Sequence, residues 1–95
     1  MPKGYWIVHV EVRDPEVYQQ YVQANAAAFA KFGARFLVRG GKHVVTRGTA
    51  PARNVVLEFE SYEAARRYFH SEQYQAARGL REGAAEIEMV LVEGV

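Results

Sequence analysis

A chain of 95 residues has room for one domain with a single core, and its hydrophobic fraction of 49% excludes a disordered protein. Twelve basic and eleven acidic residues are interspersed and leave a net charge of +1, so no basic block predicts binding to nucleic acid or to an anionic membrane. The chain has no cysteine, which excludes disulfides and thiol chemistry, and no apolar run long enough for a signal peptide or a membrane span, so a cytoplasmic protein is expected.

The first strand is expected over residues 5–12, where apolar residues alternate with others. Its apolar face consists of Trp6, Val8, Val10 and Val12. Asp14 then suits the N-cap of a helix, and Pro15 suits the first helical position. This helix is predicted to end near Phe32, because Gly33 follows and glycine commonly terminates helices. Its apolar stripe contains Tyr18, Tyr21, Val22, Asn25, Ala28, Phe29 and Phe32.

A second strand is expected over residues 35–39. Alternation puts Phe36 and Val38 on its helix-facing side, and Arg35, Leu37 and Arg39 on the other. Residues 43–47 are predicted to be extended again. We interpret the Gly40-Gly41 pair between them as a bend in one long strand, with a tight hairpin turn as the alternative.

The second half of the chain repeats the strand–helix pattern. Residues 54–60 alternate, which predicts a strand with Val55, Leu57 and Phe59 on its apolar face. Ser61 and Ser71 both suit an N-cap, so the helical region is expected to break near Ser71 and to end near Gly83. Residues expected to point inward from it are Ala65, Tyr68, Phe69, Tyr74, Ala77 and Leu80. The last strand is expected over residues 85–92, with Ile87, Met89 and Leu91 on one face.

The predicted order of elements is strand, helix, strand, strand, helix, strand. Two right-handed βαβ units of this kind give the ferredoxin-like plait, an α+β fold in which residues 1–95 form one domain with the helices on one face of an antiparallel sheet. The other face would carry a second apolar set among charges, namely Tyr5, Ile7, Leu37, Val56, Val90 and Val92. Such a patch usually marks an interface, so a homodimer that packs sheet against sheet is expected.

Several segments carry a family resemblance: Lys3-Gly-Tyr-Trp-Ile, Phe36-Leu-Val-Arg-Gly-Gly41, the Phe59-x-Ser61 turn with Ala64-Ala65, Ser71-x-x-Tyr74, and Arg81. Together they resemble the domain-of-unknown-function family 1330 over nearly the whole chain. That family belongs to the dimeric α/β-barrel superfamily, so the resemblance implies a homodimer with an eight-stranded barrel. The superfamily includes small cofactor-free monooxygenases, muconolactone isomerase and haem enzymes. The family itself has no established reaction, so the resemblance leaves the function open.

The amide of Asn25 falls on the apolar stripe of the first helix, where a buried polar group needs hydrogen-bond partners. The favoured interpretation is that it bonds a backbone group or a tyrosine and fixes packing. The alternative is that it lines a ligand pocket between helix and sheet, beside Tyr18 and Tyr21. A solvent-open cavity lined by Tyr21 and Asn25 would favour the pocket. Arg81 is interpreted as a counter-charge at the end of the last helix, or else as a residue that holds an anionic ligand at the pocket mouth.

His9, Arg39 and Glu58 are predicted to share the sheet face away from the helices. A histidine near a carboxylate is a reasonable acid–base pair, since histidine titrates near neutral pH. We favour a polar network that sets the register of the dimer, because enzymes of the superfamily mostly place substrate between sheet and helices.

No metal or cofactor site is predicted. No pair of the three histidines has a ligand spacing, and His70 is expected to be exposed at the helix break, which argues against haem. The glycine pair after the second strand does not precede a helix, which excludes a dinucleotide site. An RNA-recognition domain shares this strand order, but Glu11, Glu58 and Glu60 on the open face would repel phosphate.

These observations predict a small homodimeric protein with a helix–sheet pocket. This pocket would bind a small metabolite that is partly aromatic or acidic. The protein would either only bind the metabolite or convert it as a cofactor-free enzyme. The alternative is a non-catalytic dimeric interaction module whose polar residues are structural. The sequence names neither a reaction nor a substrate.

Overall fold

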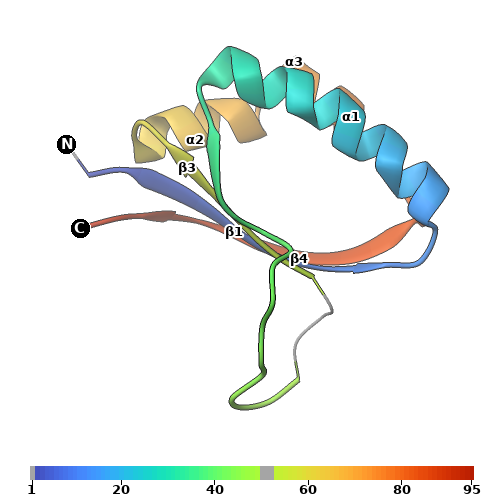
Figure 1. Cartoon of the computed structure of the whole chain (residues 1–95). Helices are drawn as coiled ribbons and strands as arrows, with labels where there is room; N and C mark the ends of the chain where they lie inside the picture. The colour runs from blue at the N-terminus through green and yellow to red at the C-terminus, as the bar shows by residue number, and fades with distance from the viewer. Residues whose placement is uncertain (1, 50–52) are drawn as a thin grey trace.

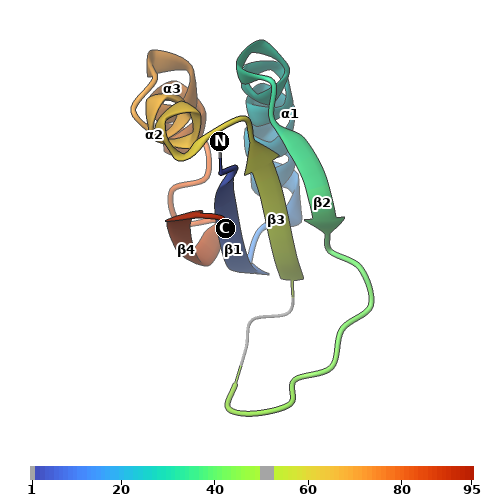
Figure 2. The ribbon, with the colours of Figure 1, turned by 90° about the vertical axis from the view of Figure 1, so that its left-hand side faces the viewer.

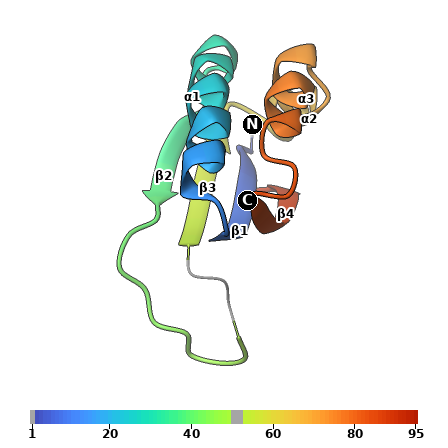
Figure 3. The same ribbon diagram turned by 90° about the vertical axis from the view of Figure 1, so that its right-hand side faces the viewer.

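One antiparallel sheet carries the helices on a single face (Figure 1). The computed structural model describes residues 2–49 and 53–95. Its elements are β1 (Gly4–Val12), α1 (Pro15–Phe32), β2 (Arg35–Arg39), β3 (Arg53–Phe59), α2 (Tyr62–Phe69), α3 (Glu72–Gly79) and β4 (Ala85–Glu93). The strand order β2-β3-β1-β4 is that of the predicted ferredoxin-like plait. α1 lies over β2 and β3, whereas α2 and α3 lie over β1 and β4 (Figures 2 and 3).

Local sequence signals begin and end the helices. The side chains of Asp14, Ser61 and Ser71 each accept the backbone N–H three residues further on, at 3.3, 3.1 and 3.1 Å, which confirms the three predicted N-caps. Gly33 ends α1 with a φ of 69°, a left-handed conformation that glycine adopts without strain. The inward stripe of α3 stops earlier than expected. The helix ends before Leu80, which caps it and is 42% exposed.

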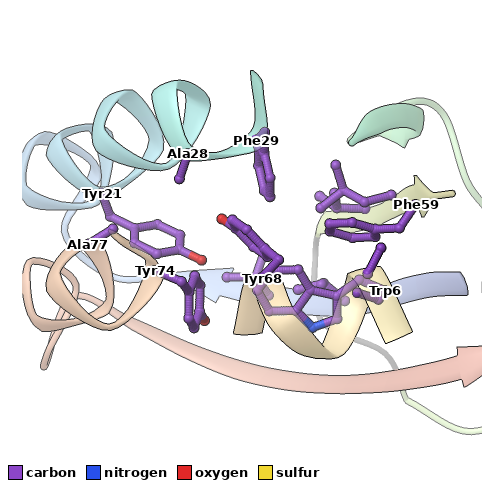
Figure 4. Packing of buried hydrophobic residues seen from close by; sticks show 14 residues of the cluster. Trp6, Tyr21, Ala28, Phe29, Phe59, Tyr68, Tyr74 and Ala77 are labelled. Carbon is purple, nitrogen blue, oxygen red and sulfur yellow. The ribbon is translucent and has the colours of Figure 1, made fainter. Parts of the chain in front are cut away.

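Tyr68 of α2 lies at the centre of an aromatic core and is 0% exposed (Figure 4). Its ring centroid lies 5.3 Å from that of Trp6, 4.9 Å from that of Phe29 and 5.4 Å from that of Phe59, in tilted or edge-on arrangements. Tyr74 of α3 packs edge-on against Trp6, with centroids 4.9 Å apart. One cluster of rings therefore joins all three helices to the sheet.

β1 passes so close to the start of α2 that only glycine fits at its first position. A Cβ atom on Gly4 would lie 2.4 Å from the carbonyl oxygen of Ser61. The missing side chain lets the α2 N-cap sit directly against the strand. This close approach sets the position of α2 over β1 and so brings Tyr68 against Trp6.

A β-bulge in β2 reverses the side-chain alternation expected for this strand. Phe36 lies opposite Leu57, but Val38 lies opposite Val56, because the register shifts between Phe36 and Val38. Residues opposite each other in a sheet point to the same side. Val38 therefore lies on the outer face and Arg39 on the helix face, whereas the sequence pattern had predicted the opposite for both.

The expected continuation of β2 beyond the glycine pair is wrong. The strand ends at Arg39, and residues 41–46 have no regular secondary structure. Gly40 has a φ of 69° and donates its N–H to the carbonyl of Asn54 at 2.8 Å, and this bond is followed by a change of chain direction. The segment that follows extends away from the helices, beyond the sheet (Figure 2).

The outer face of the sheet carries apolar side chains that no helix of the described ranges covers. Ile7 and Val56 are half-buried there, while Val90 and Val92 are 53% and 41% exposed. The second apolar set predicted from the sequence is thus present on this face. Across residues 2–49 and 53–95, no helix is long and apolar enough to cross a membrane.

Candidate functional site

A pocket lies between α1 and the helix-facing side of the sheet. α1 packs mainly against α3, and the space between α1 and strands β1, β2 and β3 is incompletely filled. The lining residues are Trp6, Val8, Tyr18, Tyr21, Val22, Asn25, Ala26, Phe29, Phe36, Arg39, Arg53, Val55 and Leu57. The space open to the centres of water molecules is about 60 Å³. One water needs roughly 10–15 Å³ on this measure, so the pocket has room for several.

The pocket has an apolar interior and an exposed rim. Its floor is formed by β1 and β3, where Trp6 and Leu57 are 1% and 2% exposed. At the rim, Ala26 of α1 and Arg39 of β2 are exposed, and Phe36 is 36% exposed. The cavity therefore opens to solvent between α1 and β2. This is the arrangement that the sequence analysis had set as the condition for a pocket.

Asn25 supplies a buried polar atom to this apolar interior. The residue is 4% exposed, and its Oδ1 atom has no hydrogen-bond partner within residues 2–49 and 53–95. The sequence analysis favoured a bond from Asn25 to a backbone group or a tyrosine, but within the described residues the structure shows no such bond to the Oδ1 atom. Buried polar atoms in folded proteins are nearly always bonded to protein or to water. The described chain therefore supplies no hydrogen-bond donor to the Oδ1 atom, and Asn25 is one of the residues that line the pocket.

Tyr18 and Tyr21 line the pocket from the preceding turns of α1, as predicted, with ring centroids 5.4 Å apart. Burial raises the pKa of Tyr21 well above its ordinary value of 10.0, and the neighbouring Tyr74 raises it further. Burial also raises the pKa of Tyr18. Both phenols therefore stay neutral at physiological pH, so they can donate or accept hydrogen bonds but cannot act as phenolate bases.

Two arginines stand at the rim of the pocket, and the sequence analysis had assigned neither of them to it. Arg39 was expected on the outer face, but the bulge turns it toward α1, where its Cζ atom lies 4.4 Å from the ring centroid of Phe36. Arg53 begins β3 opposite Val10, on the helix-facing side. The sequence analysis had placed a bend at the glycine pair after Arg39, but the bulge lies earlier in the strand, between Phe36 and Val38.

Arg81 lies outside the residues that line the pocket. It donates from Nη2 to the hydroxyl of Tyr74 at 3.1 Å, and its Cζ atom lies 5.1 Å from the ring centroid of Tyr21. Tyr21 thus stands between Arg81 and the pocket. The structure therefore does not place Arg81 among the residues of the pocket, whereas Arg39 and Arg53 belong to its lining.

The polar residues predicted to cluster on the outer face do not come together. His9 lies opposite Asn54, with Nδ1 and Oδ1 2.6 Å apart. Glu58 lies four residues further along β3, where it accepts from Tyr5 at 3.2 Å and forms an ion pair with Arg35 at 3.1 Å. A separation of four strand residues is about 13 Å, so His9 and Glu58 form no acid–base pair. With Arg39 on the other face, the cluster of three is not assembled.

A second, polar hollow of about 330 Å³ lies beside Glu58, on the same measure. Its lining residues are Lys3, Gly33, Arg35, Glu58, Phe59 and Glu60. The Arg35–Glu58 ion pair already satisfies charges within it. This hollow is therefore a weaker candidate than the pocket under α1.

Comparison with known protein families identifies the family of this chain. A family model described as a domain of unknown function (DUF1330) matches residues 3–95. The chain belongs to the DUF1330 family. No match to a curated protein was found by sequence.

Solved structures share the fold of this DUF1330 protein. A protein of unknown function from Rhodopseudomonas palustris has a TM-score of 0.78 at 16% identity, with 99% of this chain and 83% of that chain covered. A dimeric protein of unknown function and ferredoxin-like fold from Bacteroides fragilis has a TM-score of 0.63 at 19% identity, covering 96% and 95%. SnoaB, a cofactor-independent oxygenase from Streptomyces nogalater, has a TM-score of 0.62 at 15% identity, covering 97% and 92%. At these identities the likeness shows the fold alone.

The described part of this DUF1330 protein contains no group of three histidine, cysteine, aspartate or glutamate residues placed to hold a metal ion. The histidines lie on different elements. His9 is on β1, His43 is in the segment after β2, and His70 caps α2 and is exposed. The polar groups of the residues that line the pocket are two phenols, one amide, the indole N–H of Trp6 and two guanidinium groups.

Proposed function

We propose that this protein binds a small metabolite in the pocket between α1 and the sheet. The observation that carries the proposal is Asn25, which lines a cavity open to solvent and whose buried Oδ1 atom lacks a partner in the described chain. Ligand sites are typically concave and mostly apolar, with a few polar groups that fix orientation. This pocket has that composition.

The rival interpretation is a dimeric module whose polar residues serve only packing. A packing amide would be bonded to the protein, and close-packed interiors leave few voids larger than a water molecule. The unpaired oxygen of Asn25, in a residue that lines a cavity with room for several waters, supports the binding function over this rival. Binding is also the first step of cofactor-free catalysis. Among residues 2–49 and 53–95, the lining holds no carboxylate or histidine to serve as a general base, so we propose binding without assigning a reaction.

We further propose that the protein is a homodimer through the outer face of the sheet. Val90 and Val92 are exposed there, beside half-buried Ile7 and Val56. A protein with the same fold, from Bacteroides fragilis, is described as dimeric, which supports a second copy as the occupant of this face. The interface is expected to bury roughly 1,200–2,000 Å² in total, or more.

An NMR screen of small metabolites tests the binding proposal. Molecules that bind in the pocket will shift the side-chain amide signals of Asn25 and the ring signals of Tyr21. A tryptophan at Ala26, which is exposed at the rim, will block the entrance and abolish these shifts. Ala27→Trp is the matched control, because Ala27 is also exposed on α1 but lies outside the lining. Shifts confined to other surfaces, or unchanged in Ala26→Trp, would overturn the proposal.

A further inference from the structure

The two arginines at the pocket rim are neighbours on the helix-facing side of the sheet. Arg39 of β2 lies opposite Val55 of β3. Arg53 precedes Val55 by two residues and so points to the same side of β3. Diagonal positions of this kind in adjacent strands are about 7–8 Å apart. Two side chains as long as arginine can therefore both reach one small group bound between them.

Neither guanidinium is neutralised by the protein. Across residues 2–49 and 53–95, no carboxylate lies within ion-pair distance of Arg39 or Arg53. By contrast, Arg35, which points to the outer face from the same strand as Arg39, is paired with Glu58 at 3.1 Å. Both arginines line the same mostly apolar pocket, and an anion bound there would be attracted by both positive charges.

Both side chains are already supported in place. The guanidinium of Arg39 stacks on Phe36, whose ring packs edge-on against Phe29 with centroids 5.4 Å apart. Arg53 lies against Gly40, where an added Cβ would come within 2.8 Å of Nη1. A binding group that is ordered before the ligand arrives loses less conformational entropy on binding. The rim is therefore a preformed cationic site.

We infer that the ligand of this pocket is a small organic carboxylate, held at its anionic end by Arg39 and Arg53. The inference rests on the proposed binding function and names its ligand class. The apolar body of the ligand points inward between Tyr21 and Leu57, and the Oδ1 atom of Asn25 accepts from its far end. A cavity that binds benzene measures about 150 Å³. The present interior is smaller, at about 60 Å³, so the body is short or extends onto Phe36 at the rim.

Binding of matched acids and amides tests the inference. 4-Hydroxybutyrate and 4-hydroxybenzoate, whose hydroxyl groups can donate to Asn25, are titrated by NMR against 4-hydroxybutyramide and 4-hydroxybenzamide, which have similar size but no charge. The acids are expected to bind about tenfold more tightly than the amides, because a charge-assisted hydrogen bond is stronger than a neutral one. The double variant Arg39→Gln with Arg53→Gln should bind acid and amide equally, and Arg39→Lys should keep part of the preference.

The control variant is Arg35→Gln, which removes a cation from the outer face of the same strand. It should retain the full preference for acids. Equal binding of acids and amides at the Asn25 and Tyr21 signals would overturn the inference but leave the pocket as a binding site. An acid preference that persists in the double variant, or disappears in Arg35→Gln, would also overturn it. Failure of the binding proposal itself is distinct, because then none of the four probes would shift those signals.

Discussion

Arg81 donates from Nη2 to the hydroxyl of Tyr74 at 3.1 Å while its guanidinium lies over the ring of Tyr21, with Cζ 5.1 Å from the centroid. Tyr74 belongs to α3 and Tyr21 to α1. The half-buried side chain of Arg81 therefore connects these two helices. The wall of the pocket depends on the position of Tyr21. We therefore expect Arg81 to position the pocket wall through Tyr21.

Replacing this arginine tests its role. Arg81→Met keeps the length of the side chain but loses the hydrogen bond and the cation–π contact, so the free energy of unfolding should fall by about 1–3 kcal/mol. Urea denaturation measures the change. Arg78→Met is the control, because Arg78 is exposed and bonds only Gln75 of its own helix, at 3.3 Å. Equal effects of the two variants would contradict the assignment.

Tyr68 and Tyr74 allow a matched comparison of two buried hydroxyls. The hydroxyl of Tyr68 has no hydrogen-bond partner in the described chain, whereas that of Tyr74 accepts from Arg81. Tyr68→Phe removes an unsatisfied polar group and should leave stability unchanged or raise it by up to about 1 kcal/mol. Tyr74→Phe should lower it by about 1–3 kcal/mol, because Arg81 loses its partner. A larger loss for Tyr68→Phe in thermal unfolding would show that its hydroxyl is bonded.

The buried tyrosines also predict how stability depends on alkaline pH. Burial raises the pKa of Tyr21 and of Tyr68 above the ordinary value of 10.0. The unfolded chain, whose tyrosines titrate near that value, then releases protons that the folded chain retains. The stabilisation is therefore complete below pH 10 and is lost as the pH rises further, by up to about 1.4 kcal/mol per pH unit for each such tyrosine.

Urea denaturation between pH 8 and pH 11 measures this loss. The slope above about pH 10 should be shallower in Tyr68→Phe by the equivalent of about one proton. A slope that is the same in Tyr68→Phe and in the original protein would show that this phenol does not contribute to it.

Asn25 variants separate a packing role from a pocket role. If the Oδ1 atom faces a hydrated pocket, Asn25→Ala should change the free energy of unfolding by less than about 1 kcal/mol, because water replaces the amide. Asn25→Leu should likewise fold, but its side chain should block ligands found by the NMR screen. A loss of several degrees in melting temperature for Asn25→Ala, with no ligand found, would lead us to abandon the pocket.

A charge on the outer face tests the dimer. Val90→Lys places an ammonium group in the proposed interface and should convert the protein to a monomer at micromolar concentration in sedimentation velocity. Its fold should persist, because Val90 is 53% exposed in the single chain. Val44→Lys is the control, since Val44 is 81% exposed in the segment after β2. A monomer before any substitution would refute the dimer directly.

The order of the elements and the starts of the helices could be predicted from the sequence because those signals are local. Asp14, Ser61 and Ser71 cap helices through the N–H three residues away, whatever the rest of the chain does. The stripe that places Tyr21 and Asn25 under α1 depends only on helical periodicity. These local signals, with the alternation in the strands, were enough for the topology and for most of the apolar lining of the pocket.

The two arginines of the pocket were assigned to it only by the tertiary structure. The side of the sheet on which Arg39 lies depends on a bulge that forms where β2 pairs with β3, and counting along an unbroken strand gives the wrong face. Likewise, the sequence showed that His9 and Glu58 lie on neighbouring strands, but only the pairing register matched His9 with Asn54. Alternation is a property of one strand, whereas register and bulges arise from the fit between two strands, so the sequence pattern alone did not determine them.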